Sequence, residues 1–175
     1  SLIGQAQPGV VDPLNLLMYW APLKKGWIRQ ETYHAFYVLG HFLAALTFYG
    51  LCRSLSCSRV ASIAAGCGYS FAGIPGSTDW PQMFHAAIWG PAALMFQFRA
   101  LQGLAPLRNA ILSGAFLGLA WLSGHHQIPV YFTYTIAGLW AFFLVREFRA
   151  TGLNSATTRR LAAAAGHPLA GRCWV

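Results

Sequence analysis

The distribution of charge constrains this chain more than any other feature of its sequence. Four long runs contain no Asp, Glu, Lys or Arg: Thr32–Cys52 (21 residues), Val60–Thr78 (19), Trp80–Phe98 (19) and Asn109–Val145 (37). About 20 apolar residues of α-helix, at 1.5 Å rise each, cross the hydrocarbon core of a bilayer. The first three runs therefore predict one membrane-spanning helix each.

The fourth run is too long for one span, and Ser123 to Pro129 interrupts it with turn and polar residues. We interpret it as two helices. A very apolar soluble bundle is the alternative, but soluble helices carry a polar face at a period of 3.6 residues, and Phe36 to Leu46 has almost none. The sequence thus predicts an all-α polytopic transmembrane helix bundle of about five spans, near residues 32–52, 60–74, 81–98, 108–122 and 128–145.

Composition excludes several other classes of protein. Only 9% of the residues are charged, against about 25% in ordinary soluble domains. This excludes a typical soluble enzyme, a disordered tail and a disulfide scaffold. The net charge of +8 would suggest nucleic acid in a soluble domain, but the charges lie between the apolar runs, so the expected partner is the lipid bilayer and not nucleic acid.

The positive residues predict the orientation. Arginines alternate by loop, as the positive-inside rule requires, and nine of the twelve Lys and Arg fall on the inferred cytoplasmic side. The prediction is N-out and C-in, with Lys24, Lys25 and Arg29 as exceptions. Residues 1–31 are expected to end a first external loop and to contain a short interfacial helix, with Asp12 as its N-cap. Residues 149–175 are expected to be a cytoplasmic tail or a non-native end.

Ionisable residues within or beside the spans are candidates for function. An Asp79/His85 pair at the outer end of the third span is a candidate for acid–base catalysis or ligand binding, or forms a local cap and hydrogen bond. The sequence of the fourth turn, His125-His126-Gln127, suggests binding of an anionic head group or phosphate, or a polar turn at the head-group level.

The remaining motifs are less specific. Lys24, Lys25 and Arg29 form an external basic cluster suited to a lipid-linked phosphate or to ordinary anionic lipid. No residue spacing predicts a metal site or a cofactor, and the four cysteines fit no disulfide or zinc pattern, so they are interpreted as inert thiols. Small residues at Gly114/Gly118 and around Gly68 are expected to pack inside the bundle.

Three stretches in register resemble one family over roughly residues 4–148. Gly4 to Leu17 resembles the end of the first external loop of YfhO-like bacterial membrane proteins. Gly73 to Pro91, with Trp89-Gly90-Pro91, resembles their second external loop and the helix that follows. Leu122 to Gln127 resembles their Gly-His-x-Gln turn.

The resemblance implies a GT-C type glycosyltransferase in a bacterial cytoplasmic membrane, transferring sugar from a polyprenyl-phosphate carrier at the external face. In that family a carboxylate of the first external loop is the catalytic base. Because that region would precede Ser1, the chain is expected to be an inactive fragment whose base lies upstream. Asp12 stands where the family more often has an aromatic residue, so no catalytic role is transferred to it.

Two other functions remain open at this point. One is a transporter or flippase-like protein, although the helix interruptions lie at the outer helix ends and not at mid-membrane. The other is a non-catalytic membrane protein of envelope biogenesis, since the chain contains no complete catalytic set.

Overall fold

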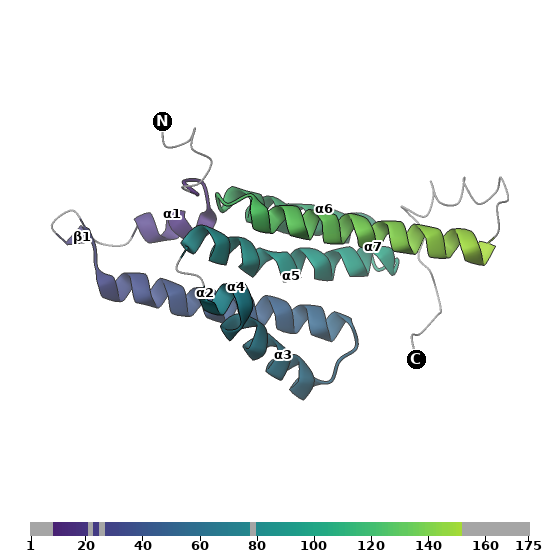
Figure 1. Cartoon of the computed structure of the whole chain (residues 1–175), viewed down its shortest axis with the longest axis horizontal. Helices are drawn as coiled ribbons and strands as arrows, with labels where there is room; N and C mark the ends of the chain where they lie inside the picture. Colours follow the sequence, from purple (N-terminus) through teal and green to yellow (C-terminus); the bar gives the residue numbers. More distant parts are fainter. Residues whose placement is uncertain (1–8, 21–22, 25–26, 78–79, 152–175) are drawn as a thin grey trace.

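The part of the chain that the structure describes consists of helices and one short hairpin. The computed structural model describes residues 9–20, 23–24, 27–77 and 80–151. Its elements are α1 (Pro13–Tyr19), β1 (Leu23–Lys24), β2 (Trp27–Ile28), α2 (Gln30–Ser54), α3 (Arg59–Phe71), α4 (Gly73–Ser77), α5 (Pro81–Leu101), α6 (Pro106–Leu122) and α7 (Gln127–Thr151) (Figure 1). The two strands pair antiparallel, with Leu23 opposite Ile28. The predicted all-α class is confirmed.

Local sequence signals begin and end these helices. Asp12 is the N-cap of α1, as predicted, and accepts a hydrogen bond from Leu14 N, while Pro13 takes the first helical position. The side chain of Ser58 caps α3 by accepting from Ala61 N at 3.2 Å. Pro81 and Pro106 stand in the first turns of α5 and α6, where the missing N–H costs no hydrogen bond.

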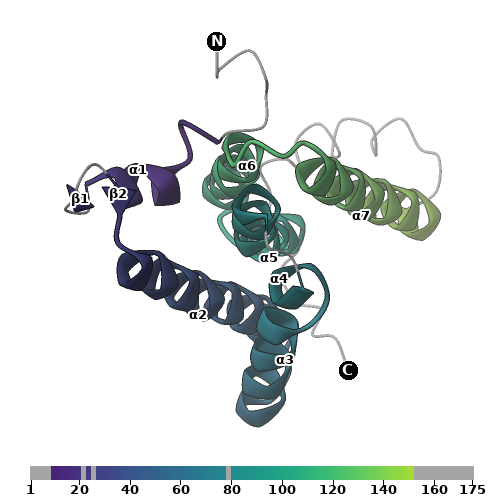
Figure 2. The ribbon, with the colours of Figure 1, turned by 60° about the vertical axis from the view of Figure 1, so that its left-hand side comes forward.

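Helix α5 lies at the centre of the bundle. It contacts α2, α4, α6 and α7, and α3 packs mainly on α2; Figure 2 shows α5 between these neighbours. Phe84 and Ile88 of α5 form a core with Ala44 of α2 and Leu14 of α1. A second core joins Ala86 and Ala87 of α5 to Ile128 of α7.

The outer faces of the helices are apolar. On α2, Val38, Phe42 and Leu46 are 70%, 62% and 50% exposed and form one stripe at a spacing of four residues. The opposite face buries the small residues Gly40 and Ala44. This is the reverse of a water-soluble helix, which turns its apolar stripe inward. An apolar medium around the bundle would suit such a surface.

Two of the described helices are long and apolar enough to span a membrane, namely Gln30–Ser54 and Gln127–Arg149. Helices α3, of 13 residues, and α6, of 17 residues, fall short of the roughly 20 residues that a perpendicular span needs. The segment predicted as a span near 60–74 is divided, because the chain is extended at Ala72 after α3 and Gly73, the first residue of α4, takes a left-handed conformation (φ +59°). Five spans therefore remain a prediction.

The expectation that the small residues at Gly114/Gly118 and around Gly68 pack inside the bundle is wrong. A Cβ added at Gly68, Gly114 or Gly118 would meet no atom of the described structure within 4 Å. The close approaches use other glycines: a Cβ at Gly66 would lie 2.7 Å from Ala45 O, and one at Gly40 would lie 2.4 Å from the Phe84 ring. Sequence spacing identifies a face of small residues, but the packing of the helices decides which face is covered.

Pro91 leaves a backbone carbonyl of α5 without its helical partner. Proline has no N–H, so Ala87 O cannot accept the usual bond from four residues onward. The Tyr69 hydroxyl of α3 donates to this oxygen at 2.8 Å. Thr47 of α2 donates to Ile88 O at 2.9 Å, and Ser113 of α6 donates to Ala93 O at 2.9 Å. Three helices thus satisfy backbone carbonyls of the central helix.

Tyr69→Phe is expected to destabilise the bundle by about 1–3 kcal/mol, because it orphans a buried carbonyl. In a Pro91→Ala background the restored N–H of residue 91 can bond to Ala87 O, so the same substitution is expected to cost less. The coupling between the two positions is measured by unfolding the parent, both single variants and the double variant in detergent, followed by circular dichroism. Equal costs of Tyr69→Phe in both backgrounds would contradict it.

Candidate functional site

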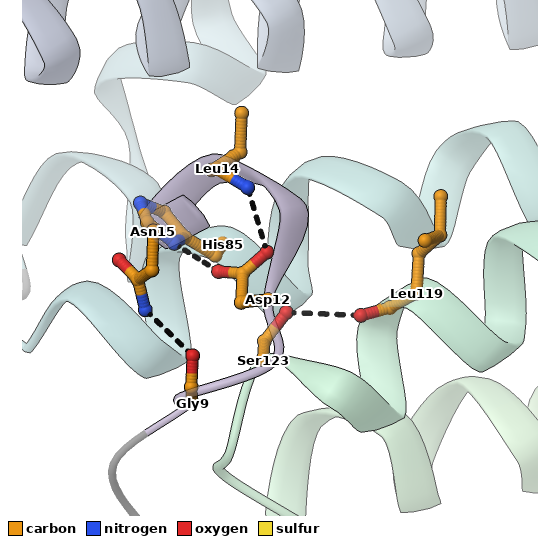
Figure 3. A network of polar contacts seen from close by, with 7 residues as sticks. All are labelled: Gly9, Asp12, Leu14, Asn15, His85, Leu119 and Ser123. Carbon is orange, nitrogen blue, oxygen red and sulfur yellow. Dashed lines mark hydrogen bonds and ion pairs between the residues drawn. The ribbon is translucent and has the colours of Figure 1, made fainter. Parts of the chain in front are cut away.

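A cluster of polar side chains lies where the segment before α1, the start of α5 and the turn between α6 and α7 meet (Figure 3). Gly9 takes a left-handed conformation (φ +52°), and a Cβ there would lie 2.5 Å from Ser123 O. Asn15 Nδ2 donates to Gly9 O at 3.0 Å. Glycine therefore allows the N-terminal segment to lie directly against the α6–α7 turn.

Asp12 and His85 form a buried pair at the centre of this cluster. The Asp12 carboxylate is fully buried: Oδ1 accepts from Leu14 N at 3.2 Å, and Oδ2 contacts His85 Nδ1. His85 is 8% exposed. A carboxylate can only accept, so Nδ1 carries the proton that it shares with Asp12. This arrangement fixes the imidazole and directs the other ring nitrogen, Nε2, away from the carboxylate.

His125 lies in the α6–α7 turn, two residues after Ser123, and has an unused hydrogen-bonding atom. Its side chain is 9% exposed, and its buried Nδ1 has no hydrogen-bond partner in the described structure. Its ring stacks on His126, with 5.7 Å between centroids, and meets the edge of Trp80 at 6.2 Å. A buried polar atom without a partner costs free energy, so a ligand that bonds to Nδ1 would remove this cost.

Burial lowers the pKa of His125, and the neighbouring His126 lowers it further. The neutral form of the ring is therefore favoured at neutral pH. The sequence left two interpretations of this turn, an anion-binding site or a polar turn at the head-group level. In its neutral form His125 has no charge to offer a phosphate, but one ring nitrogen can donate a hydrogen bond to it.

An apolar cavity of about 370 Å³ lies at the same end of the bundle, lined by none of Asp12, His85 and His125. Ala87, two residues after His85, lines it, and so does Ile128, three residues after His125. The other lining residues come from the end of α3, from α4 and from α7: Tyr69, Ala72, Gly73, Pro75, Tyr131 and Phe132. The Tyr69 and Tyr131 hydroxyls already bond to Ala87 O and Gln127 Nε2, so the cavity offers mainly hydrocarbon.

The structure brings only some of the predicted site residues together. His85 and His125 belong to the cluster, and His126 and Gln127 lie exposed at its rim. The Arg29 side chain pairs with Glu31. Asp79 and Lys25 lie outside the described residues, and of Lys24 only the backbone is described, in β1.

The acidic partner of His85 was missed by sequence reasoning. Asp79 was paired with His85 because it is six residues away, whereas Asp12 is 73 residues away and was interpreted only as a helix cap. One signal was present, since Asp12 is one of only four acidic residues in the chain. Within the described residues, no group of three His, Cys, Asp or Glu side chains could hold a metal ion.

Comparison with protein families, curated proteins and solved structures finds no match to this chain.

Asp12→Ala is expected to destabilise the protein on two accounts. It leaves the buried His85 N–H without an acceptor, at about 1–3 kcal/mol, and it removes the cap of α1, at about 1 kcal/mol. Asp12→Asn keeps a capping oxygen and should lose only the first contribution. Denaturant unfolding in detergent measures both variants. An Asp12→Ala variant as stable as the parent would contradict the role of the pair.

The lowered pKa of His125 predicts a pH dependence of stability. The unfolded chain, with a histidine pKa of about 6.5, binds more protons than the folded chain below that value. This contribution to the free energy of unfolding is therefore complete above about pH 6.5 and is lost as the pH falls toward the folded pKa. His125→Gln should flatten this part of the stability profile, measured by thermal unfolding against pH. An identical slope in parent and variant would contradict it, and His34→Gln, at an exposed histidine of α2, is the control.

Proposed function

We propose that the chain is a polytopic protein of a bacterial cytoplasmic membrane, with about five spans. The exposed apolar faces of α2 and α7 support this proposal. So does the position of the arginines, which lie near the helix ends opposite α1: Arg53, Arg59, Arg99, Arg108, Arg146 and Arg149. By the positive-inside rule, the end that carries the Asp12–His85 pair then faces outward.

We further propose that this end acts on a lipid-linked sugar, as the resemblance to YfhO-like GT-C proteins implies. The observation that carries the proposal is the buried Asp12–His85 pair. The same end of the bundle also holds an apolar cavity, lined by residues of α3, α4, α5 and α7. In sugar transfer, an acceptor hydroxyl loses its proton while its oxygen attacks the anomeric carbon. The bond from that carbon to the carrier phosphate breaks, and the polyprenyl phosphate leaves.

Each part of the site has a role in this proposal. In place of the upstream carboxylate that the resemblance implies, His85 Nε2 accepts the proton of the hydroxyl, and Asp12 holds the imidazole and stabilises its protonated form. This chain itself is then active, contrary to the expectation from the sequence. His125 donates a hydrogen bond from Nδ1 to the carrier phosphate. This bond gives a partner to the buried Nδ1, which has none in the described structure, and so removes the free-energy cost of burying it unpaired. The cavity takes the first isoprenoid units of the carrier, since its lining is almost entirely apolar.

Binding is tested first, on the full chain in native-like membranes. A polyprenyl-phosphate sugar with a photoreactive group in its isoprenoid chain is expected to label peptides that contain Tyr69 to Pro75 and Ile128 to Phe132. Unlabelled polyprenyl phosphate should compete, and a phosphatidylethanolamine of equal concentration should not. Labelling spread evenly over the exposed faces of α2 and α7 would contradict a specific site.

Catalysis is tested by sugar transfer from the same carrier in membranes that contain the protein. His85→Gln is expected to lower the transfer rate by about 100-fold or more, as for a lost general base, while leaving photolabelling in place. His34→Gln, an exposed histidine of α2, is the matched control and should transfer normally. Transfer at the parent rate by His85→Gln would overturn the role of His85.

A further inference from the structure

The turn between α2 and α3 brings two cysteines together. Helix α2 ends in a Schellman motif: Cys57 N bonds to Cys52 O at 3.1 Å, and Ser56 N bonds to Arg53 O at 3.2 Å. Ser56 takes the left-handed position of the motif with φ +65°. In this motif the side chains of the two residues joined by the longer backbone bond frequently lie against each other. Here these two residues are Cys52 and Cys57.

Both cysteines are free, and their thiols lie close enough to interact electrostatically. Cys52 is 8% exposed, whereas Cys57 is half-buried and accessible from the turn. A disulfide needs two Cα atoms about 4.4–6.8 Å apart with converging Cβ atoms, and a turn closed by these backbone bonds brings its end residues close in this way.

The surroundings of the pair are basic. Arg53 and Arg59 are both exposed on either side of Cys57, and Arg53 Nη1 donates to Cys57 O. An anionic small-molecule disulfide would be attracted to this turn, because the two guanidinium groups complement its carboxylates. Oxidised glutathione has this chemistry.

We propose that Cys52 and Cys57 form a redox-sensitive dithiol that oxidised glutathione converts to a disulfide. The Cys57 thiolate attacks the glutathione disulfide, forming a mixed disulfide and releasing one glutathione thiolate. The Cys52 thiolate then attacks the Cys57 sulfur and releases the second. Two protein thiols and one glutathione disulfide thus become one protein disulfide and two molecules of reduced glutathione, and the end of α2 is linked covalently to the residue before the cap of α3.

The test uses the full chain in detergent, equilibrated with oxidised and reduced glutathione at several ratios, then alkylated and digested with trypsin. Cleavage after Arg53 separates the two cysteines, so the disulfide joins the peptide ending at Arg53 to the peptide Ser54–Arg59. We expect this cross-linked product to appear with rising oxidation and to disappear on reduction, while Cys67 remains alkylated. In Cys52→Ser, Cys57 should instead accumulate as the mixed disulfide with glutathione.

Two results would overturn the proposal. One is wild-type protein in which Cys57 carries glutathione as stably as in Cys52→Ser. The other is equal oxidation of Cys67, an exposed cysteine of α3 outside the turn, which would show that exposure and not the geometry of the turn controls the reaction. Cys67→Ser serves as the control and should form the cross-linked product at the same glutathione ratio as the wild type.

Discussion

The need to satisfy the backbone of one enclosed helix underlies the whole arrangement. Helix α5 is buried on several sides, and Pro91 removes one of its internal hydrogen bonds. Hydroxyls from α2, α3 and α6 donate to its carbonyls: Thr47 to Ile88, Tyr69 to Ala87 and Ser113 to Ala93. In an apolar medium water cannot supply these donors. The bonds therefore fix the rotation of three helices against α5.

That fixed rotation also builds the polar end of the molecule. His85 lies one turn into α5, and its neighbours Phe84 and Ile88 pack against Leu14 of α1. This contact holds Asp12 in place to pair with the imidazole, while Gly9 and Ser123 hold the α6–α7 turn alongside. A buried carboxylate is costly unless paired, so the pair and the packing depend on each other.

The two ends of the bundle differ in chemistry. The α1 end holds buried imidazoles, a buried carboxylate and an apolar cavity. The opposite end holds exposed arginines and a turn that contains two free cysteines. Arginines gathered at one end of a helical bundle are the pattern that the positive-inside rule describes. The buried histidines and the carboxylate lie at one end of the bundle, and the two cysteines of the α2–α3 turn lie at the other.

Sequence alone determined the helical class, the approximate helix positions and the cap at Asp12, because apolar run length and capping chemistry are local properties. It also identified His85 and His125 as candidates. It could not find the partner of His85, since Asp12 is distant along the chain and local spacing favoured Asp79. Nor could it tell which glycines pack, because Gly66 and Gly68 differ only in the face they present. Those features were decided by tertiary structure, where the rotation and docking of whole helices determine which side chains meet.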